Sequence, residues 1–352
     1  MSEDDFRARF VDPTDAAAFS ALLDHISDRR VIYVGEIHDR YDHHQNQLAV
    51  VRGLQERGID LAIGMEYFQE PFQAYLDDYV GGRLDEKGML RKTEYYGRWR
   101  YDFRLYRDIL EYARRHRLPL VALNAPGELV DAVSTKGIEG LSPEERARLP
   151  ALIEPVDASY EKRLRDAFSM HGNMPEERFQ RFMEVQTTWD EYMARRAADY
   201  LRRHPDKALV VLVGAAHVLH DAAIPKRLRR YQDINQAVIV TKPFEPLLGV
   251  TPDYVLASQE LELERRGRMG MTLQDTDTGV RVASVKSDSP AYAAGFRAGD
   301  RILRMDGEHI AALGDVRLTL HDRGPGERLT VHLERSAPER PPEQIKRVLR
   351  LL

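Results

Sequence analysis

Short apolar runs that end in polar residues recur along the first two thirds of the chain. Positions 31–34 and 208–213 form two such runs, and each passes through a glycine before it reaches a histidine. Two further runs, 61–65 and 120–123, lie between them along the chain. Runs of this length that alternate with amphipathic helical stretches predict buried strands in an α/β fold. We therefore expect a mainly parallel sheet flanked by helices.

The polar residues that follow these four runs are predicted to lie close together. The carboxyl ends of parallel strands share one edge of a sheet, so residues placed there converge without further assumptions. One such residue alone is often a helix cap or a hydrogen-bonded loop residue, whereas four strand ends together favour a shared site. His44 opens the next helical stretch, where it could line the same cleft or belong to a solvated, histidine-rich helix start. The residues at the strand ends are Glu36, His38, Glu66, Asn124 and His217.

The regular alternation of strands and helices stops after the third run. Positions 135–205 are mostly helical, which predicts a helical insertion of the kind that often forms a lid or a dimerising arm. A homodimer formed through such an arm is therefore one of the alternatives. Pro243, Pro246 and Pro252 mark the end of this part of the chain. Short strands and glycine turns follow from about Arg268. We expect an α/β domain at 15–250 and a small β-rich domain at 265–352.

Composition and charge narrow the class of protein. The 352 residues carry a formal net charge of -5, which gives no basic field for nucleic acid. No run approaches the roughly 18 apolar residues of a membrane span, and the start lacks the apolar core of a signal peptide. The chain as written is expected to be soluble. The periplasm or the envelope is expected if a signal was removed. The absence of cysteine excludes disulfides and thiolate ligands.

Aromatic residues gather near the predicted edge of the sheet. Tyr67 follows Glu66 directly, and positions 95–103 mix rings with Arg98 and Arg100. Rings can cover a flat apolar ligand while arginines meet its carboxylates, so this pattern suits haem. A tyrosinate is a known axial ligand of ferric iron, and the candidates are Tyr67, Tyr96 and Tyr101. A loop that packs on the sheet by its aromatic side chains explains the same residues equally well.

The motifs at the strand ends resemble those of the ChaN-like haem-binding uptake family of the Tiki superfamily, across about residues 30 to 245. The resemblance implies an α/β fold and haem binding, while the Tiki relatives are metal-dependent proteases that use two Gly-x-x-His motifs. Supporting matches include Gln186 and the pair Trp189-Asp190. The main motifs are Gly35-Glu36-Ile37-His38, Gly64-Met65-Glu66, Leu123-Asn124 and Gly214-Ala215-Ala216-His217.

The remainder of the chain resembles a PDZ domain. Ser289-Pro290-Ala291, Gly299-Asp300 and Asp306-Gly307 carry this resemblance together with the start of the domain. In that family a loop binds the terminal carboxylate of a peptide, which then adds as a strand to the sheet edge. The residues expected in this role are Met269, Gly270, Met271, Thr272 and Leu273.

Two functions from different classes follow. The first is a haem-binding protein of iron acquisition or haem trafficking, whose PDZ module docks a peptide or protein partner. The alternative is a metal-dependent hydrolase, plausibly a peptidase, with PDZ-mediated recruitment of substrate. In that alternative, manganese, cobalt or zinc would bind His38, His217, Glu36 and Glu66, and a glutamate that is not a ligand would act as the general base. A third interpretation treats the polar strand ends as a structural network.

The two glutamates carry an electrostatic expectation of their own. Neighbouring carboxylates raise each other's proton affinity unless a cation lies between them. Placing Glu36 beside Glu66 therefore predicts a bound metal or a protonated histidine between them.

Overall fold

The computed structural model of the protein describes residues 9–155, 158, 161–162, 165, 175–218, 223–242, 252–337 and 340–352. These residues divide into two compact units. The first contains residues 1–85 and 101–262, and the second contains residues 86–100 and 263–352. None of the helices in the described ranges has the length and apolar character that a membrane span requires.

The first unit is built around a parallel sheet of seven strands. Every strand pair in it is parallel, in the order β1-β7-β6-β2-β5-β3-β4. This confirms the predicted mainly parallel sheet. The strands are β1 (Arg9–Val11), β2 (Val31–Glu36), β3 (Leu61–Gln69), β4 (Leu120–Asn124), β5 (Ala208–Gly214), β6 (Gln236–Thr241) and β7 (Tyr254–Leu256).

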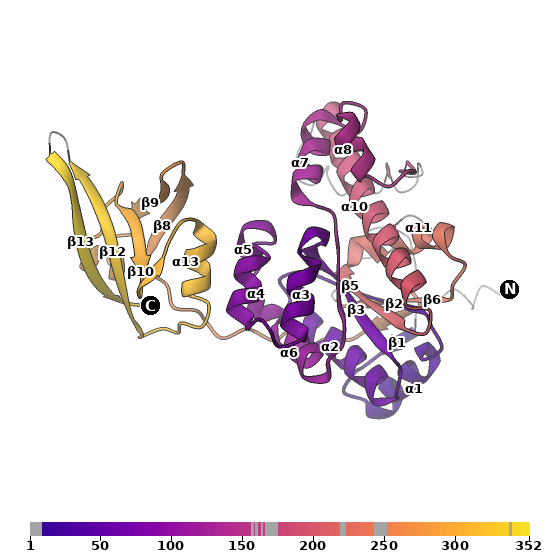
Figure 1. The fold of residues 1–352 in the computed structure, drawn as a ribbon. Helices are drawn as coiled ribbons and strands as arrows, with labels where there is room; N and C mark the ends of the chain where they lie inside the picture. The colour runs from indigo at the N-terminus through magenta and orange to yellow at the C-terminus, as the bar shows by residue number, and fades with distance from the viewer. Residues whose placement is uncertain are drawn as a thin grey trace. The chain divides into compact units, whose positions relative to one another are not determined.

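The central strands are apolar because both faces of the sheet are covered. Every residue of β2 and β5 is buried, as expected for parallel strands with helices on either side. The helices of this unit are α1 (Ala16–Ile26), α2 (Tyr41–Glu56), α3 (Gln73–Val80), α6 (Arg107–His116), α7 (Gly127–Lys136), α8 (Pro143–Arg148), α10 (Glu176–Arg203) and α11 (Ile224–Tyr231). In Figure 1, α10 and α11 lie on one side of the sheet and α1 on the other.

The predicted helical insertion contains α10, which carries the chain from the edge of the sheet back to its middle. Strand β4 lies at one edge, whereas the next strand along the chain, β5, pairs with both β2 and β3. The crossover helix α10 packs Met193 and Ala197 against Tyr33 and Val211 in one buried apolar cluster. As a result the four strands that bear polar ends, β2, β5, β3 and β4, are consecutive neighbours in the sheet.

The second unit is mainly an antiparallel β domain, which confirms the β-rich fold predicted for the carboxyl-terminal residues. Its strands run in the order β13-β12-β10-β9-β8, and β11 pairs with β10. Val282, Ile302, Val331 and other apolar residues fill its core. The elements are β8 (Met271–Thr276), β9 (Gly279–Val285), α12 (Pro290–Ala293), β10 (Arg301–Met305), β11 (Glu308–His309), α13 (Leu313–Thr319), β12 (Arg328–Ala337) and β13 (Arg340–Arg350).

Residues 86–100 belong to this second unit although they lie within the α/β part of the sequence. They form two short helices, α4 (Glu86–Lys92) and α5 (Tyr95–Arg98). Both helices contact α13. Residues 86–100 fall within the α/β domain predicted at 15–250, and their place in the carboxyl-terminal unit was not predicted from the sequence.

Candidate functional site

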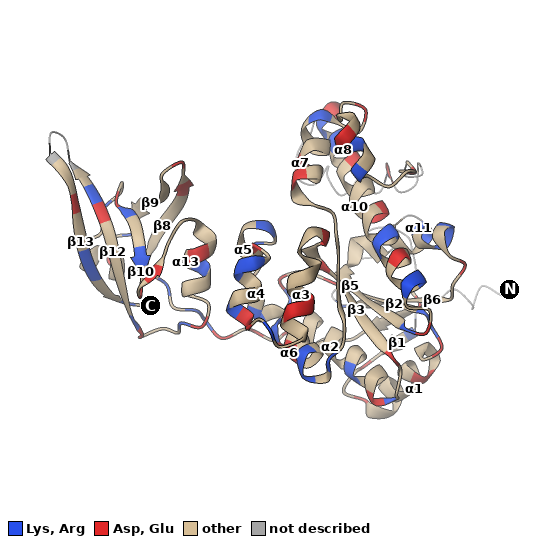
Figure 2. Ribbon diagram, viewed as in Figure 1, with Lys and Arg blue, Asp and Glu red and all other residues tan. Residues whose placement is uncertain are grey.

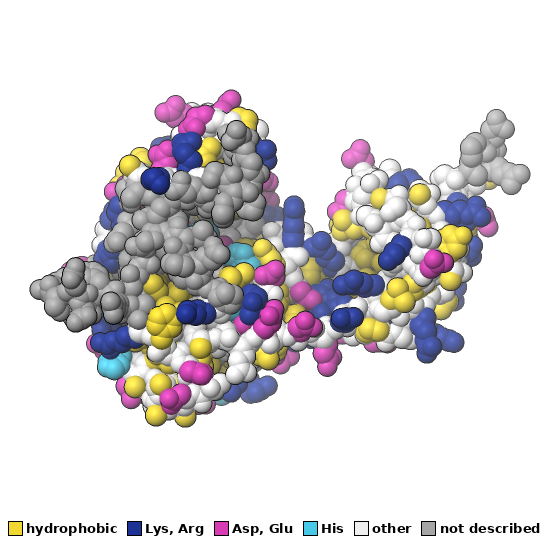
Figure 3. All heavy atoms as spheres, turned by 180° about the vertical axis from the view of Figure 1, so that it is seen from behind, with side chains coloured by type: hydrophobic (Ala, Val, Ile, Leu, Met, Phe, Trp, Pro, Cys, Tyr) yellow, Lys and Arg dark blue, Asp and Glu magenta, His cyan; other side chains and the backbone are white. Residues whose placement is uncertain are grey.

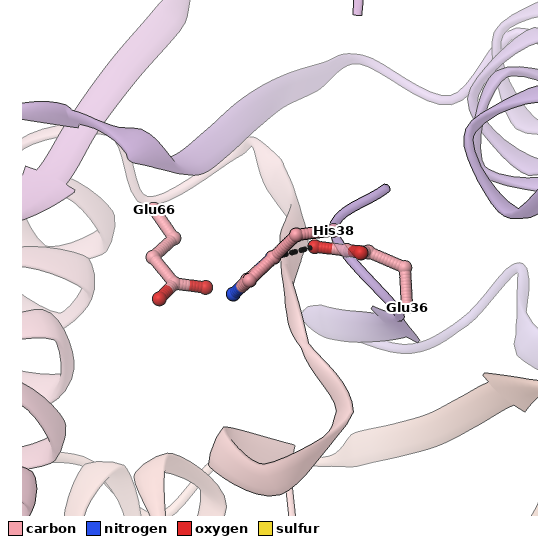
Figure 4. Close-up of side chains that lie close together, drawn as sticks. All are labelled: Glu36, His38 and Glu66. Atoms are coloured by element: carbon pink, nitrogen blue, oxygen red, sulfur yellow. Dashed lines mark hydrogen bonds and ion pairs between the residues drawn. The ribbon is translucent and has the colours of Figure 1, made fainter. Parts of the chain in front are cut away.

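The first unit brings two carboxylates and an imidazole together at the carboxyl edge of its sheet. Glu36 ends β2, and its Oε1 lies 2.5 Å from Nδ1 of His38. Glu66 reaches the same place from β3, so one ligand atom from each of the three side chains lies within 4.8 Å of the other two. Figure 4 shows the imidazole of His38 between the two carboxylates. A protonated His38 could therefore supply the positive charge that was predicted between Glu36 and Glu66.

A second histidine–carboxylate pair adjoins this group. His217 lies in the short turn η4 (Ala215–Val218) after β5, and its Nε2 is 3.6 Å from Oε1 of Glu66. Its Nδ1 is 2.7 Å from Oδ1 of Asp190, a fully buried residue of α10. A carboxylate in this position holds the ring orientation of a histidine. Asp190 entered the sequence analysis only through the family pattern, because nothing local marks it as part of the site.

The electrostatics of the group favour positively charged imidazoles. Burial opposes protonation of His38, but the charge of Glu66 and the hydrogen bond to Glu36 outweigh it and raise the pKa of His38 from 6.5 to about 9. Burial likewise opposes protonation of His217, while Glu66 and Asp190 raise its pKa. His38 is therefore an imidazolium at neutral pH, and it relieves the repulsion between the two glutamates.

Glycine is required where β5 approaches His38. A Cβ placed on Gly214 would lie 2.9 Å from Cε1 of His38, closer than real Cβ contacts allow. The backbone N–H of Gly214 also donates to Oε2 of Glu66 at 2.8 Å. The glycine of the second Gly-x-x-His motif thus makes room for the histidine of the first.

Three of the other candidate residues make hydrogen bonds that surround the carboxylates. His44 is fully buried, and its Nε2 lies 3.2 Å from the carbonyl oxygen of His38. Asn124 donates to the carbonyl oxygen of Glu66 at 2.9 Å and so holds that residue's backbone. Tyr67 is buried and donates to Gln47. These contacts make His44, Asn124 and Tyr67 parts of the framework around the carboxylates.

The three candidate tyrosines have different surroundings. Tyr101 is partly buried, and its ring centroid lies 5.1 Å from that of His38. Burial, followed by the charges of Asp39, Glu36 and Glu66, raises the pKa of the Tyr101 phenol. Tyr96 belongs to the second unit, where its hydroxyl lies 2.6 Å from Nδ1 of His321. Tyr101 is therefore the candidate tyrosine that lies beside His38 and is not fully buried.

The two candidate arginines lie in the second unit. Arg98 pairs with Glu94 across one turn of α5, with 2.8 Å between Nη2 and Oε2. Arg100 is exposed at the end of the segment, in a left-handed backbone conformation with φ of 74°.

The expected peptide-binding residues lie where the second unit begins its sheet. Met269 is buried in the core, and Gly270 follows with φ of 78°. A Cβ on Gly270 would lie 2.3 Å from Cβ of Ser289, so only glycine fits there. Met271, Thr272 and Leu273 lie on β8, which is at the edge of the sheet among the described strands. An edge strand in this place can accept an added strand.

Residues 22–228 match the family described as haem-binding uptake, Tiki superfamily, ChaN, and this match covers more than half of the chain. The chain belongs to this family. ChaN of Campylobacter jejuni, in a solved structure described as showing cofacial heme binding, matches with a TM-score of 0.55 and 18% identity. That match covers 68% of this chain and 91% of the other. At such identity the likeness to ChaN shows the fold alone.

The carboxyl-terminal part of this ChaN-family chain matches the PDZ domain at residues 267–341. Syntenin-1 of Mus musculus is 30% identical over 87 residues, which are 21% of this chain and 29% of syntenin-1. The chloroplastic protein RETICULATA-RELATED 5 of Arabidopsis thaliana is 31% identical over 124 residues, which are 33% of this chain and 16% of that protein. The chain thus spans less than a third of the length of either relative.

Proposed function

We propose that this ChaN-family protein binds haem beside His38, with Tyr101 as the residue that holds the iron. The observation that carries the proposal is the position of Tyr101. Its partly buried ring lies against His38, whereas Tyr67 is buried and Tyr96 belongs to the second unit. A tyrosinate is a hard anionic ligand that suits ferric iron. Bound haem would supply an iron centre for transport or storage, and the PDZ domain would dock a partner in iron acquisition or haem trafficking.

Hemin titration of the purified protein tests this proposal. We expect a Soret band that saturates near one haem per chain in the wild type and is shifted or lost in Tyr101→Phe. Tyr292→Phe changes an exposed tyrosine of the second unit and serves as the matched control with an unchanged spectrum. A wild type with no Soret shift at tens of micromolar hemin would refute haem binding. A band that survives unchanged in Tyr101→Phe would refute the assigned ligand.

A second function is supported by a specific observation at Glu36. Its Oε2 is buried and accepts no hydrogen bond from the described residues. An orphaned carboxylate oxygen that faces other ligand types is the arrangement expected where a cation binds. Glu36, His38 and Glu66 would hold a divalent metal, with His217 beside them. Such a metal supplies Lewis acidity and lowers the pKa of a bound water, which is the chemistry of a hydrolase.

Zinc equilibrium dialysis separates the two functions. Under the hydrolase proposal we expect about one zinc per chain, lost in both His38→Ala and His217→Ala. His309→Ala alters an exposed histidine of β11 and should retain the metal. Retention of zinc in both site variants would place the metal elsewhere and would remove this function from the Glu36 group.

A further inference from the structure

The second unit contains a cavity of about 670 Å³ that is bounded by three elements. Two of them are the later part of β8, from Leu273 to Asp275, and helix α13 together with Ala312 before it. The third is the segment 86–100, which contributes residues of α4 and α5. A peptide that adds to β8 would lie between β8 and α13. The segment 86–100 therefore borders the space that such a peptide would enter, at the end of β8 away from Gly270.

Buried polar contacts hold this segment in place. His321 is fully buried and lies 2.6 Å from the hydroxyl of Tyr96 through one ring nitrogen, and 2.6 Å from Glu86 through the other. Arg317 of α13 donates to the carbonyl oxygens of Tyr96 and Arg100, at 3.2 and 3.3 Å. Both ring nitrogens of His321 thus make contacts within the unit. We therefore interpret Glu86 and His321 as a structural contact and not as a metal site. The segment 86–100 is therefore an ordered part of the cavity lining.

Three carboxylates and three arginines line the cavity, and they differ in how they are engaged. Asp275 accepts from the backbone of Leu313, and Asp315 accepts from the backbone of Ala311 and Ala312. Glu94 pairs with Arg98. Glu94 is thus paired with a cation, whereas Asp275 and Asp315 keep their charge and are held by backbone N–H donors. Arg91, Arg100 and Arg317 are the cations that line the cavity.

Arg100 is the lining cation most open to a ligand. Arg91 reaches Glu308 at 3.3 Å in an exposed pair, and Arg317 donates to two carbonyl oxygens. The side chain of Arg100 is exposed. The whole second unit is also basic, with 21 Lys and Arg residues against 15 Asp and Glu residues. Basic positions recur along β10, β12 and β13 (Figure 2), and several are visible on this unit from behind (Figure 3).

We propose that residues 86–100 form a third wall of the PDZ groove, and that Arg100 on this wall selects peptide tails with an acidic residue three to five positions before the carboxyl terminus. A strand that adds antiparallel to β8, with its carboxylate at the Met269–Met271 loop, brings those positions beside Leu273 to Asp275. The inference rests on the proposed docking role of the PDZ domain. It adds to that role a specificity determinant that comes from the α/β part of the sequence.

Fluorescence anisotropy with two labelled peptides tests the inference on the full chain. The probes are Gly-Ser heptapeptides that end in Val and carry either Glu or Lys at the fourth position from the end. We expect the Glu peptide to bind roughly fivefold more tightly than the Lys peptide, as for an exposed ion pair. The preference should weaken at high salt. Arg100→Glu should reverse the preference, whereas Arg297→Glu, at an exposed position that does not line the cavity, should keep it.

The outcomes separate the selectivity from the docking role on which it rests. Equal binding of both peptides by the wild type, or an unchanged preference in Arg100→Glu, overturns the proposed selection of acidic tails by Arg100. Either result leaves the peptide-docking role intact. Binding of neither peptide at millimolar concentration overturns the docking role, and the inference falls with it. An unchanged melting temperature in Arg100→Glu shows that any loss of preference is not a loss of fold.

Discussion

His38 owes its position to a neighbouring residue that contributes no side chain. The ring lies against the backbone of Gly214, where a methyl group would come within 2.9 Å of it. Glu66 uses the N–H of the same residue as a hydrogen-bond donor. A small change at this glycine therefore disturbs the imidazole and a carboxylate together.

Gly214→Ala should displace His38 and abolish haem or zinc binding. Overpacking at such a buried contact costs about 1–3 kcal/mol of unfolding free energy, which urea denaturation would measure. Gly97→Ala is the matched control, because a Cβ at Gly97 meets nothing within 4 Å. Full ligand binding in Gly214→Ala would show that the ring of His38 is not constrained as described.

The raised pKa of His38 predicts how stability depends on pH in the ligand-free protein. Its folded pKa, about 9, lies above the usual 6.5, so protonation favours the folded state. That contribution is fully present below pH 6.5 and is lost as the pH rises through about 9. We expect the wild type to lose more thermal stability than His38→Gln between pH 6.5 and 9, as measured by scanning calorimetry. Parallel curves for the two proteins would contradict the raised pKa.

Residues at strand ends were predictable, whereas those that reach the site from helices were not. Glu36, Glu66 and His217 follow apolar runs, and the topology of a parallel sheet brings such positions together. Asp190 lies inside an amphipathic helix, where an acidic residue usually indicates a solvated face. The aromatic stretch at 95–103 has no clear period, so nothing in it separates Tyr96 from Tyr101.

At the level of elements, α10 connects the site to a buried ionic network. Next to Asp190, Glu191 is fully buried and pairs with Arg230 and with Arg227, whose Nε is 3.2 Å away. Arg227 is itself 1% exposed. Removal of one partner from such a pair leaves an uncompensated buried charge.

Glu191→Gln should therefore lower the unfolding free energy by about 3–5 kcal/mol. Asp199→Asn alters a pair with Arg202 on the exposed side of the same helix, and its effect should stay below about 1 kcal/mol. Urea denaturation of both variants provides the comparison. Equal losses of unfolding free energy in the two variants would mean that the network around Glu191 stabilises the fold no more than a surface ion pair does.

The elements that the sequence analysis did not predict are short or depend on distant partners. Strands β1 and β7 contain three residues each and pair with one another across the whole α/β part of the chain. Segments this short leave no measurable periodicity. By contrast, the mostly helical stretch predicted at 135–205 contains α10, whose 28 residues are long enough to show a helical period.

At the scale of the whole molecule, the second unit is discontinuous in sequence. Its carboxyl-terminal residues pack with 86–100 through Tyr96, His321 and Glu86. The connection at Gln259 to Glu262 is exposed and lies outside the strands and helices. Cleavage of this connection therefore does not remove the contacts between 86–100 and the rest of the unit.

A site-specific protease sequence inserted after Glu260 should allow complete cleavage without separation of the fragments. We expect the two pieces to elute together in gel filtration under native conditions. The same insertion combined with Tyr96→Ala removes the hydroxyl that reaches His321 and should loosen the association. Clean separation of the fragments from the otherwise unaltered protein would show that 86–100 does not hold the carboxyl-terminal residues.

The segment 86–100 ends one residue before Tyr101. Arg317 holds the carbonyl oxygen of Arg100, and the ring of the following residue lies against His38. Under the two proposals, adjacent residues would therefore contact the haem and the peptide tail. Any coupling between the two ligands would be symmetrical by thermodynamic linkage. A peptide tail that strengthens haem binding by some factor must itself be bound more strongly by that same factor when haem is present.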